Sequence, residues 1–412
     1  MEKLQNKIPL VRFPEFKDDW EHKELNELLS ESKKKNADLK YSKEEVLSVS
    51  GELGIVNQIK HLGRSYAGVS VHNYGVVEVG NIVYTKSPLK VNPYGIIKIN
   101  KGKAGIVSTL YAVYKVNEKT AYGNFLDYYF SLDANTNRYL RPLVRKGAKN
   151  TLQVTDEEAI KGKVFLPEVP EQKRIANFFS VLDNKINELK EKKALLSAYK
   201  KGVMQKIFSQ DIRFKDDDGK EFGDWEEKKL GDIAKITSGG TPNRSRKNYW
   251  NGNIPWISTS LINFNTIDTA EEFISDKGIA NSSAKLFPKG TLLMAMYGQG
   301  KTRGKVAMLG IKASTNQACC AIITNDEINT DFLFQNLADR YDEIRNLSNE
   351  GGQQNLSGGL IKNIPFPFPT LPEQIKIVNF LSKIDNKINK VNEQIEESKE
   401  YKKGLLQKMY CV

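Results

Sequence analysis

Residues 170–206 read PEQKRIANFFSVLDNKINELKEKKALLSAYKKGVMQK, and residues 372–408 read PEQIKIVNFLSKIDNKINKVNEQIEESKEYKKGLLQK. The two stretches align without a gap at an offset of 202 positions (372 − 170), and about half of the paired residues are identical. A direct repeat of this length and quality indicates a fused tandem dimer. We therefore interpret the rest of the chain as two units that share this repeat.

The apolar residues of each stretch predict a long helix. They recur at steps of three and four, as in the series that begins Ile175, Phe178 and Leu182, and this spacing forms a stripe along one side of a helix. Pro170 and Pro372 fit a first helical turn, and the glutamate that follows each favours the positive end of the helix dipole. Each helix would be about 60 Å long at 1.5 Å per residue, longer than a domain of this size. We therefore expect the two helices to pack on each other as an antiparallel coiled coil with pseudo-twofold symmetry, with one domain at each end.

The repeat continues into the domains as a hydrophobic frame. Arg12 and Trp20 are echoed by Arg213 and Trp225, so both units open in the same way. The polar residues between the framing positions do not repeat. One scaffold is therefore expected to carry two different surfaces.

Short β-branched or apolar runs, separated by Gly, Asn, Ser and Pro, predict mixed, β-rich domains. The expected strands lie within 76–84, 95–99, 104–116, 291–297, 305–311 and 317–324, and the expected short helices are 23–30, 125–132 and 330–347. Prolines punctuate the exit of each domain, where proline cannot continue a sheet ladder. The predicted class is α+β, with two β-rich domains separated by the two long helices. The predicted boundaries are 1–169 for the first domain, 170–210 for the first helix, 211–369 for the second domain and 370–412 for the second helix.

Composition narrows the function classes. With 412 residues, 39% hydrophobic and 9% aromatic, the chain is expected to be globular. A net charge of +12 favours a polyanionic partner, nucleic acid before an anionic membrane surface. Cys319 and Cys320 are adjacent and Cys411 is nearly terminal, a pattern that predicts neither a disulfide framework nor a metal site. With no signal-like or membrane-spanning run of apolar residues, we expect a reducing, cytoplasmic setting.

Several phrases in fixed order carry a family resemblance. They are Ser-Gly-Gly-Thr-Pro at 238–242, Ile-Pro-Trp-Ile at 254–257, Asn-Gln-Ala at 316–318, and Asn-Ile-Pro-Phe-Pro at 363–367 running into Leu-Pro-Glu-Gln at 371–374. Together with the duplicated helix, they make the chain resemble the specificity subunit of type I restriction-modification systems over essentially all its length. The first domain departs from the pattern, because it lacks the Gly-Gly-Thr-Pro and Pro-Trp-Ile phrases of the second.

The resemblance implies a DNA-reading subunit without chemistry of its own. Two target recognition domains would each read one half of a bipartite target in double-stranded DNA, and the paired helices would set the gap between the halves. Two methyltransferase subunits would dock on this chain, and motor-nuclease subunits would complete the restriction complex. Methyl donor, ATP and magnesium would then be used by the partner subunits, so no cofactor is expected in this chain.

DNA contacts are expected from loop residues with suitable chemistry. Lys and Arg neutralise phosphates, whereas Gln, Asn and Arg can make paired hydrogen bonds to base edges. In the first domain the candidates are Arg64, Ser65, Tyr66, Lys146, Lys149 and Asn150. In the second domain they are Thr241, Arg244, Arg246, Lys247, Tyr249, Gln299, Lys301, Arg303, Gln353, Gln354 and Asn355. A basic surface that is merely solvated would use the same residue types.

Motifs that suggest catalysis are incomplete. Gly-Gln-Gly-Lys-Thr at 298–302 resembles a phosphate-binding loop, but Ala295 occupies the position of the required first glycine. Asn-Ile-Pro-Phe at 363–366 resembles the Asn-Pro-Pro-Phe element of DNA methyltransferases without its first proline, and we interpret it as an exit linker. The three histidines form no cluster of metal ligands. We therefore expect neither catalytic nor metal-binding residues.

Two other interpretations remain open at this point. The chain could be a coiled-coil adaptor whose domains bind protein or RNA. It could also be the specificity subunit of a different, fused restriction-methylation system. Loss of methylation at one bipartite motif when the chain is removed would distinguish DNA reading from an adaptor role.

Overall fold

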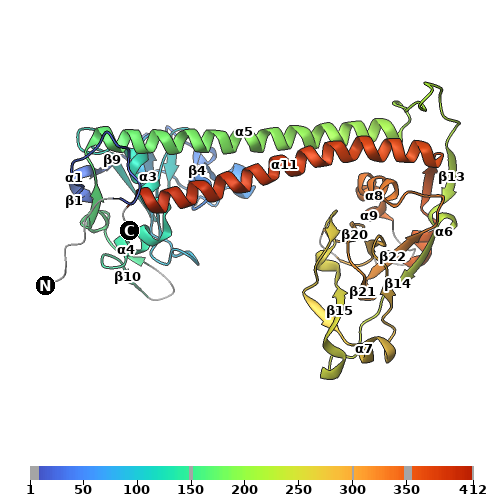
Figure 1. Cartoon of the computed structure of the whole chain (residues 1–412). Helices are drawn as coiled ribbons and strands as arrows, with labels where there is room; N and C mark the ends of the chain where they lie inside the picture. Colours follow the sequence, from blue (N-terminus) through green and yellow to red (C-terminus); the bar gives the residue numbers. More distant parts are fainter. Residues whose placement is uncertain (1–8, 148–151, 299–300, 348–354, 411–412) are drawn as a thin grey trace. The chain divides into compact units, whose positions relative to one another are not determined.

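The computed structural model describes residues 9–147, 152–298, 301–347 and 355–410 (Figure 1). The chain forms two compact units, one made of Met1–Lys190 with Glu393–Val412 and the other of Glu191–Asn392. Each unit thus combines one globular domain with a part of each long helix. Among the helices of the described residues, none is both long enough and apolar enough to cross a membrane.

The domain of the first unit is built on a four-stranded antiparallel sheet in the order β2-β9-β6-β7. These strands are Leu29–Glu31, Tyr111–Val116, Ile82–Thr85 and Ile96–Ile99. Side chains alternate between its two faces: Ile82 and Tyr84 pack into the main core with Phe125, whereas Val83 packs on the other face with Leu47. Both faces of the sheet are therefore covered.

The other elements of this domain are short. Four antiparallel strand pairs are formed by β1 with β12 (Glu21–Glu24, Lys163–Leu166), β3 with β4 (Leu47–Ser50, Gly54–Asn57), β5 with β8 (Gly75–Val77, Gly105–Val107) and β10 with β11 (Arg145–Lys146, Leu152–Gln153). The helices are α1 (Leu25–Leu28), α2 (Gln58–Leu62), α3 (Gly123–Ser131) and α4 (Asp133–Leu140), with 3-10 turns at Lys43–Glu45 and Glu158–Ile160. Helix α3 supplies the largest apolar contribution among them, because most of its residues are buried.

The domain of the second unit contains a five-stranded sheet and a four-stranded sheet. The first has the order β14-β22-β19-β20-β16 (Ala234–Ser238, Cys319–Thr324, Leu292–Ala295, Val306–Leu309, Thr266–Ile267), and the second β17-β15-β21-β18 (Glu272–Ile274, Trp250–Ile257, Ala313–Thr315, Leu286–Phe287). Strand β19 again alternates: Leu292 and Met294 face one core and Leu293 faces another.

Short helices and one further strand pair complete this domain. The helices are α6 (Leu230–Ile233), α7 (Asp276–Ala280), α8 (Thr330–Asp339), α9 (Tyr341–Asn346) and α10 (Gly358–Lys362), with 3-10 turns at Lys247–Tyr249 and Thr259–Leu261. Strands β13 (Glu226–Lys229) and β23 (Pro365–Phe368) form a separate antiparallel pair.

The two long helices are α5 (Val169–Phe208) and α11 (Leu371–Met409). In the first unit α5 contributes Ile175 and Phe179 to a core that also holds Leu406 of α11. In the second unit Ile207 of α5 shares a core with Ile377 of α11. The start of one helix thus lies against the end of the other within each unit, which confirms the predicted antiparallel packing and the α+β class.

Some local predictions are wrong in detail. The run 76–84 is divided between β5 and β6 because Gly80, at φ +85°, turns the chain. The expected helix 23–30 shrinks to the single turn α1 since its flanks pair as strands β1 and β2. The expected helix 330–347 breaks at Arg340 into α8 and α9. The exit linker at 363–366 instead leads into β23, a two-stranded pairing in which proline is tolerated.

Candidate nucleic-acid interface

The first turn of each long helix carries a buried glutamate and glutamine that form hydrogen bonds with the domain before it. In the first unit these are Glu171 and Gln172, which are 2% and 0% exposed. The Glu171 carboxylate accepts hydrogen bonds from Nε and Nη2 of Arg12, both at 2.7 Å, and this pairing raises the pKa of Arg12. Gln172 accepts the Tyr122 amide at 2.8 Å and donates to the Pro167 carbonyl at 2.8 Å. The helix is thereby fixed to its domain by both side chains.

The second unit repeats these contacts at equivalent positions. Glu373 and Gln374 are both 0% exposed. Arg213 donates to Glu373 from Nε at 3.2 Å and from Nη2 at 2.9 Å. Gln374 accepts the Asn329 amide at 2.8 Å and donates to the Pro369 carbonyl at 2.8 Å. The duplicated Pro-Glu-Gln phrase is therefore an anchor between domain and helix, a role that its helix-start signature did not reveal.

A second duplicated contact joins the two helices. In the first unit the Lys402 ammonium of α11 pairs with Asp183 of α5, which also accepts the Tyr128 hydroxyl at 2.7 Å. In the second unit the Lys200 ammonium of α5 pairs with Asp385 of α11 at 2.7 Å. The aspartates and the lysines are each 202 positions apart, so both halves of the repeat contribute the same ion pair. These pairs fix the antiparallel register within each unit.

The loop after β14 carries the first candidates of the second domain. The Arg244 guanidinium lies 3.8 Å from the centre of the Trp250 ring and donates to Glu272 from Nη2 at 3.0 Å. The bond with Glu272 raises the pKa of Arg244 and lowers that of the carboxyl. These three side chains border a hollow of about 510 Å³ that Lys247 also lines. The sequence did not reveal this support for Arg244, because Glu272 lies 28 positions away.

The neighbouring candidates differ in exposure and in whether they already take part in hydrogen bonds. Arg246 and Lys247 are exposed, and within the described residues their side chains form no hydrogen bond or ion pair. The Thr241 hydroxyl donates to the Gln317 side chain. Tyr249 is half-buried and its carbonyl accepts a backbone amide at 2.9 Å. Arg246 and Lys247 are thus the candidates here that are available to a phosphate without breaking an existing contact.

The next two candidate loops are only partly described. Lys301 is exposed and its carbonyl accepts the Tyr341 hydroxyl at 2.6 Å. Arg303 is 7% exposed, so its guanidinium is not presented on the surface. Asn355 is half-buried. The remaining candidates Gln299, Gln353 and Gln354 lie outside the described residues.

In the first domain the candidates occupy two separate segments. After α2, the Arg64 guanidinium stacks over Tyr66 at 4.6 Å from the ring centre, and Tyr66 is 58% exposed. The Ser65 hydroxyl accepts a backbone amide at 3.2 Å. Lys146 is exposed on β10, with its ammonium 5.2 Å from the Tyr94 ring centre. Lys149 and Asn150 lie outside the described residues.

Metal binding needs a group of ligand side chains, and thiol chemistry needs a cysteine that can react as a thiolate. The described residues contain no group of three or more His, Cys, Asp or Glu side chains that could hold a metal ion. Cys319 and Cys320 are buried free thiols, and burial raises the pKa of each to about 12. Thiols this far from ionisation at neutral pH are poor nucleophiles and metal ligands.

Comparison with known proteins shows which sequences and structures the chain resembles. Residues 223–398 match the model of the type I restriction modification DNA specificity domain. The chain is 32% identical over 195 residues to the MjaIX specificity subunit of Methanocaldococcus jannaschii. It is 28% identical over 194 residues to the EcoR124I/EcoR124II specificity subunit of Escherichia coli. Both alignments cover 46% of this chain, and they span 44% and 46% of the two relatives, less than half of their length.

Two solved structures share the fold over nearly the whole chain. The S subunit of a type I restriction-modification system from M. genitalium aligns with a TM-score of 0.58 at 15% identity, covering 98% of this chain and 99% of that one. A chain from a study of complex assembly in a type I system aligns with a TM-score of 0.57 at 18% identity, covering 95% and 97%. At these identities the structural likeness concerns the fold alone. The chain is thus similar in sequence, over part of its length, to type I restriction-modification specificity subunits, and residues 223–398 match their DNA specificity domain.

Proposed function

We propose that this chain is the DNA-reading subunit of a type I restriction-modification complex. The domains 1–169 and 211–369 would each read one half of a bipartite target in double-stranded DNA. The helices 170–210 and 370–412 would set the gap between the half-sites. The chain itself would be non-catalytic.

The duplicated anchor beneath dissimilar loops carries this proposal. Glu171 and Glu373 hold the same arginine contact, and Gln172 and Gln374 make the same backbone contacts. The loops that each domain presents differ in sequence and in arrangement. A protein that reads two unlike half-sites requires two different surfaces, each attached to its helix in the same way.

The candidate side chains divide by the task that their chemistry suits. Exposed Arg246, Lys247 and Lys146 would neutralise phosphates, which gives affinity without sequence information. Arg244 and Tyr66 are held in stacked arrangements and would be positioned for contacts to bases or sugars. The polar candidates that lie outside the described residues would add base-edge hydrogen bonds.

The similarity to specificity subunits suggests the partners. Two methyltransferase subunits would dock on the duplicated helices, and motor-nuclease subunits would complete the restriction complex. Methyl donor, ATP and magnesium would be bound by those subunits. A complex that acts on cellular DNA in this way would work in the cytoplasm.

Methylome sequencing tests the proposal directly. Cells that carry the methyltransferase partner should lose methylation at one bipartite motif when this chain is deleted, and regain it on complementation. An unchanged methylome would refute DNA reading. Exchange of residues 212–365 for the corresponding domain of another family member should change one half of the motif. A change in both halves would contradict the model of two independent readers.

The spacer role has a separate test. Insertion of one or two helical turns after Asn187 should change the gap between half-sites or abolish binding, because the insertion lengthens one helix of the pair. Methylation at unchanged spacing would remove the spacer role. It would leave DNA reading by the two domains intact.

A further inference from the structure

A cavity of about 570 Å³ lies in the first unit where the domain meets the two long helices. It is bordered by the tip of the β3–β4 hairpin, by β7 and α3, and by one stretch each of α5 and α11. Its charged lining includes Lys98, Lys101, Lys190 and Lys402 together with Glu52, Asp127 and Asp183. Cations thus outnumber anions in a confined space.

Lys98 is the unusual member of this set. It lies on strand β7 and is only 9% exposed. Within the described residues its ammonium forms no hydrogen bond or ion pair, and burial lowers its pKa. The side chain is thus nine-tenths buried, while its ammonium has no hydrogen bond within the described residues and lines a cavity that an anion could enter.

The two aspartates that line the cavity already have partners. Asp127 pairs with the Lys101 ammonium at 2.7 Å and accepts the Ile99 amide at 3.1 Å. Asp183 pairs with Lys402 and accepts the Tyr128 hydroxyl. Each carboxylate therefore already has a cation and a second donor of its own, and Asp127 acts on Lys98 through its charge without forming an ion pair with it.

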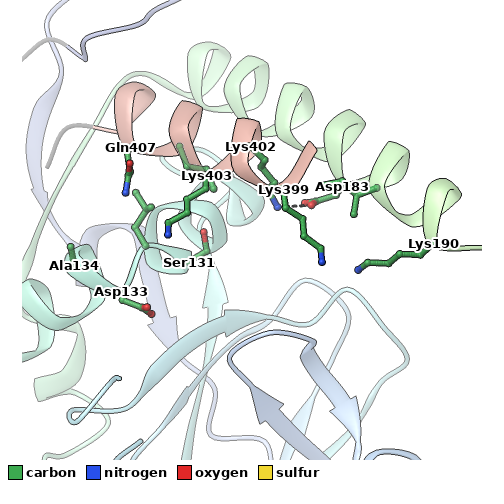
Figure 2. A pocket seen from close by; sticks show the side chains of 12 residues that line it. Ser131, Asp133, Ala134, Asp183, Lys190, Lys399, Lys402, Lys403 and Gln407 are labelled. Atoms are coloured by element: carbon green, nitrogen blue, oxygen red, sulfur yellow. Dashed lines mark hydrogen bonds and ion pairs between the residues drawn. The ribbon is translucent and has the colours of Figure 1, made fainter. Parts of the chain in front are cut away.

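Lys190 is a second cation without a partner among the described residues, and it also lines the adjoining hollow. That hollow, of about 670 Å³, shares Lys190, Lys402 and Asp183 with the first cavity. Figure 2 shows Lys190, Lys399 and Lys403 extending from the helices, with Lys402 bonded to Asp183. The approach to Lys98 is therefore also positively charged.

We propose that this junction cavity binds a phosphate group through Lys98 and Lys190, which both line it. A phosphate is compact, carries up to two negative charges at neutral pH and offers several acceptor oxygens, so one group can satisfy both ammonium ions. The phosphate could belong to a small phosphorylated molecule or to the backbone of DNA. The second source rests on the proposed function, whereas the first is independent of it.

Thermal unfolding of the full chain in inorganic phosphate, against chloride at equal ionic strength, tests the proposal. At ten times its Kd, phosphate should raise the Tm of the first unit by about 3–5 °C. Lys98→Met should raise the Tm in chloride, because it removes the unpaired charge, and should abolish the phosphate-dependent gain. Lys115→Met, at an exposed position of the same sheet, should keep the gain. Glu52→Gln removes a competing anion at the cavity and should enlarge the phosphate-dependent gain in Tm.

Binding to a nonspecific DNA duplex identifies the source of the phosphate. If DNA supplies it, Lys98→Met should lower the slope of log K against log salt by about one. If a small molecule supplies it, the slope should stay unchanged while the thermal gain persists in the wild type. Absence of DNA binding by the wild type would count against the proposed function and leave the thermal result to stand alone.

Three results would overturn the proposal. Phosphate could fail to raise the Tm of the wild type. The gain could persist in Lys98→Met, which would place the anion elsewhere. An acidic peptide could stabilise the wild type where phosphate does not, which would assign the cavity to carboxylates of a protein partner.

Discussion

Replacing Gln374 with leucine tests whether the duplicated anchor holds a domain to its helix. The side chain is 0% exposed. Its oxygen accepts the Asn329 amide at 2.8 Å, and its nitrogen donates to the carbonyls of Pro369 at 2.8 Å and Glu327 at 3.3 Å. Leucine is close to glutamine in size but offers none of these groups, so the substitution removes the bonds without opening a large cavity.

The cost can be worked from these three contacts. A buried donor left without a partner costs about 1–3 kcal/mol, and loss of a neutral hydrogen bond costs about 0.5–1.5 kcal/mol. The Asn329 amide would be left as a buried donor without a partner and carries the larger cost. The two carbonyls keep a second lone pair, so each loses only a neutral hydrogen bond. The better burial of leucine offsets part of the sum. We therefore expect the free energy of unfolding of the second unit to fall by about 3 kcal/mol.

Urea denaturation followed by tryptophan fluorescence measures this loss. Trp225, Trp250 and Trp256 report on the second unit and Trp20 on the first. Two-state behaviour cannot be assumed for a chain of two units, so the transition of each unit is followed through its own tryptophans. Gln374→Leu should shift the second-unit transition and leave the Trp20 signal nearly unchanged.

The repeat supplies the matched controls for this experiment. Gln172→Leu, the equivalent change in the first unit, should shift the Trp20 transition by a similar amount. Asn386→Leu, at an exposed position of the same helix within the second unit, should change stability by less than about 0.5 kcal/mol. A loss below about 1 kcal/mol for Gln374→Leu would refute the anchor role.

Three further predictions concern single contacts. Arg213→Ala leaves the Glu373 carboxylate, 0% exposed, without its cation, and should cost about 3–5 kcal/mol in urea denaturation; a loss near zero would contradict the pairing. Arg244 lowers the pKa of Glu272, so the pair stabilises above the unfolded pKa of about 4.3 and is lost as pH falls through the lowered folded pKa. The stability gap between wild type and Glu272→Gln should accordingly shrink from pH 6 towards pH 3, and a gap that widens would reverse the assigned sign. Gly95→Ala should destabilise by about 3 kcal/mol, since its φ is +94° and a Cβ would lie 2.0 Å from a backbone carbonyl oxygen of β6; an unchanged urea midpoint would show that the chain relaxes there.

The long helices could be predicted because their signal is local and periodic. The stripe that begins at Ile175 repeats every three to four residues, and the same stripe returns 202 positions later. Burial in the loops depends on distant segments and could not be predicted in this way. Arg303 follows a glycine-rich loop that suggested exposure, yet it is buried. Arg244 was correctly located in a loop, but the partner that fixes it, Glu272, comes from a separate strand.

Comparison of the two halves of the repeat separates the scaffold from the chemistry of each unit. Positions that carry duplicated contacts are identical in both halves, as with Asp183 and Asp385 in the ion pairs between helices. Lys190, by contrast, corresponds to Asn392, which accepts the Lys193 ammonium at 2.6 Å instead of lining a basic cavity. The lysine is therefore not required for helix packing, since the equivalent place is filled by a neutral side chain with a contact of its own. Lys190, which helix packing does not require, lines the same cavity as Lys98, and a bound ligand explains this pair of cations better than the fold does. We therefore assign the phosphate site to the first unit, and Asn392→Lys alone should create no such site in the second.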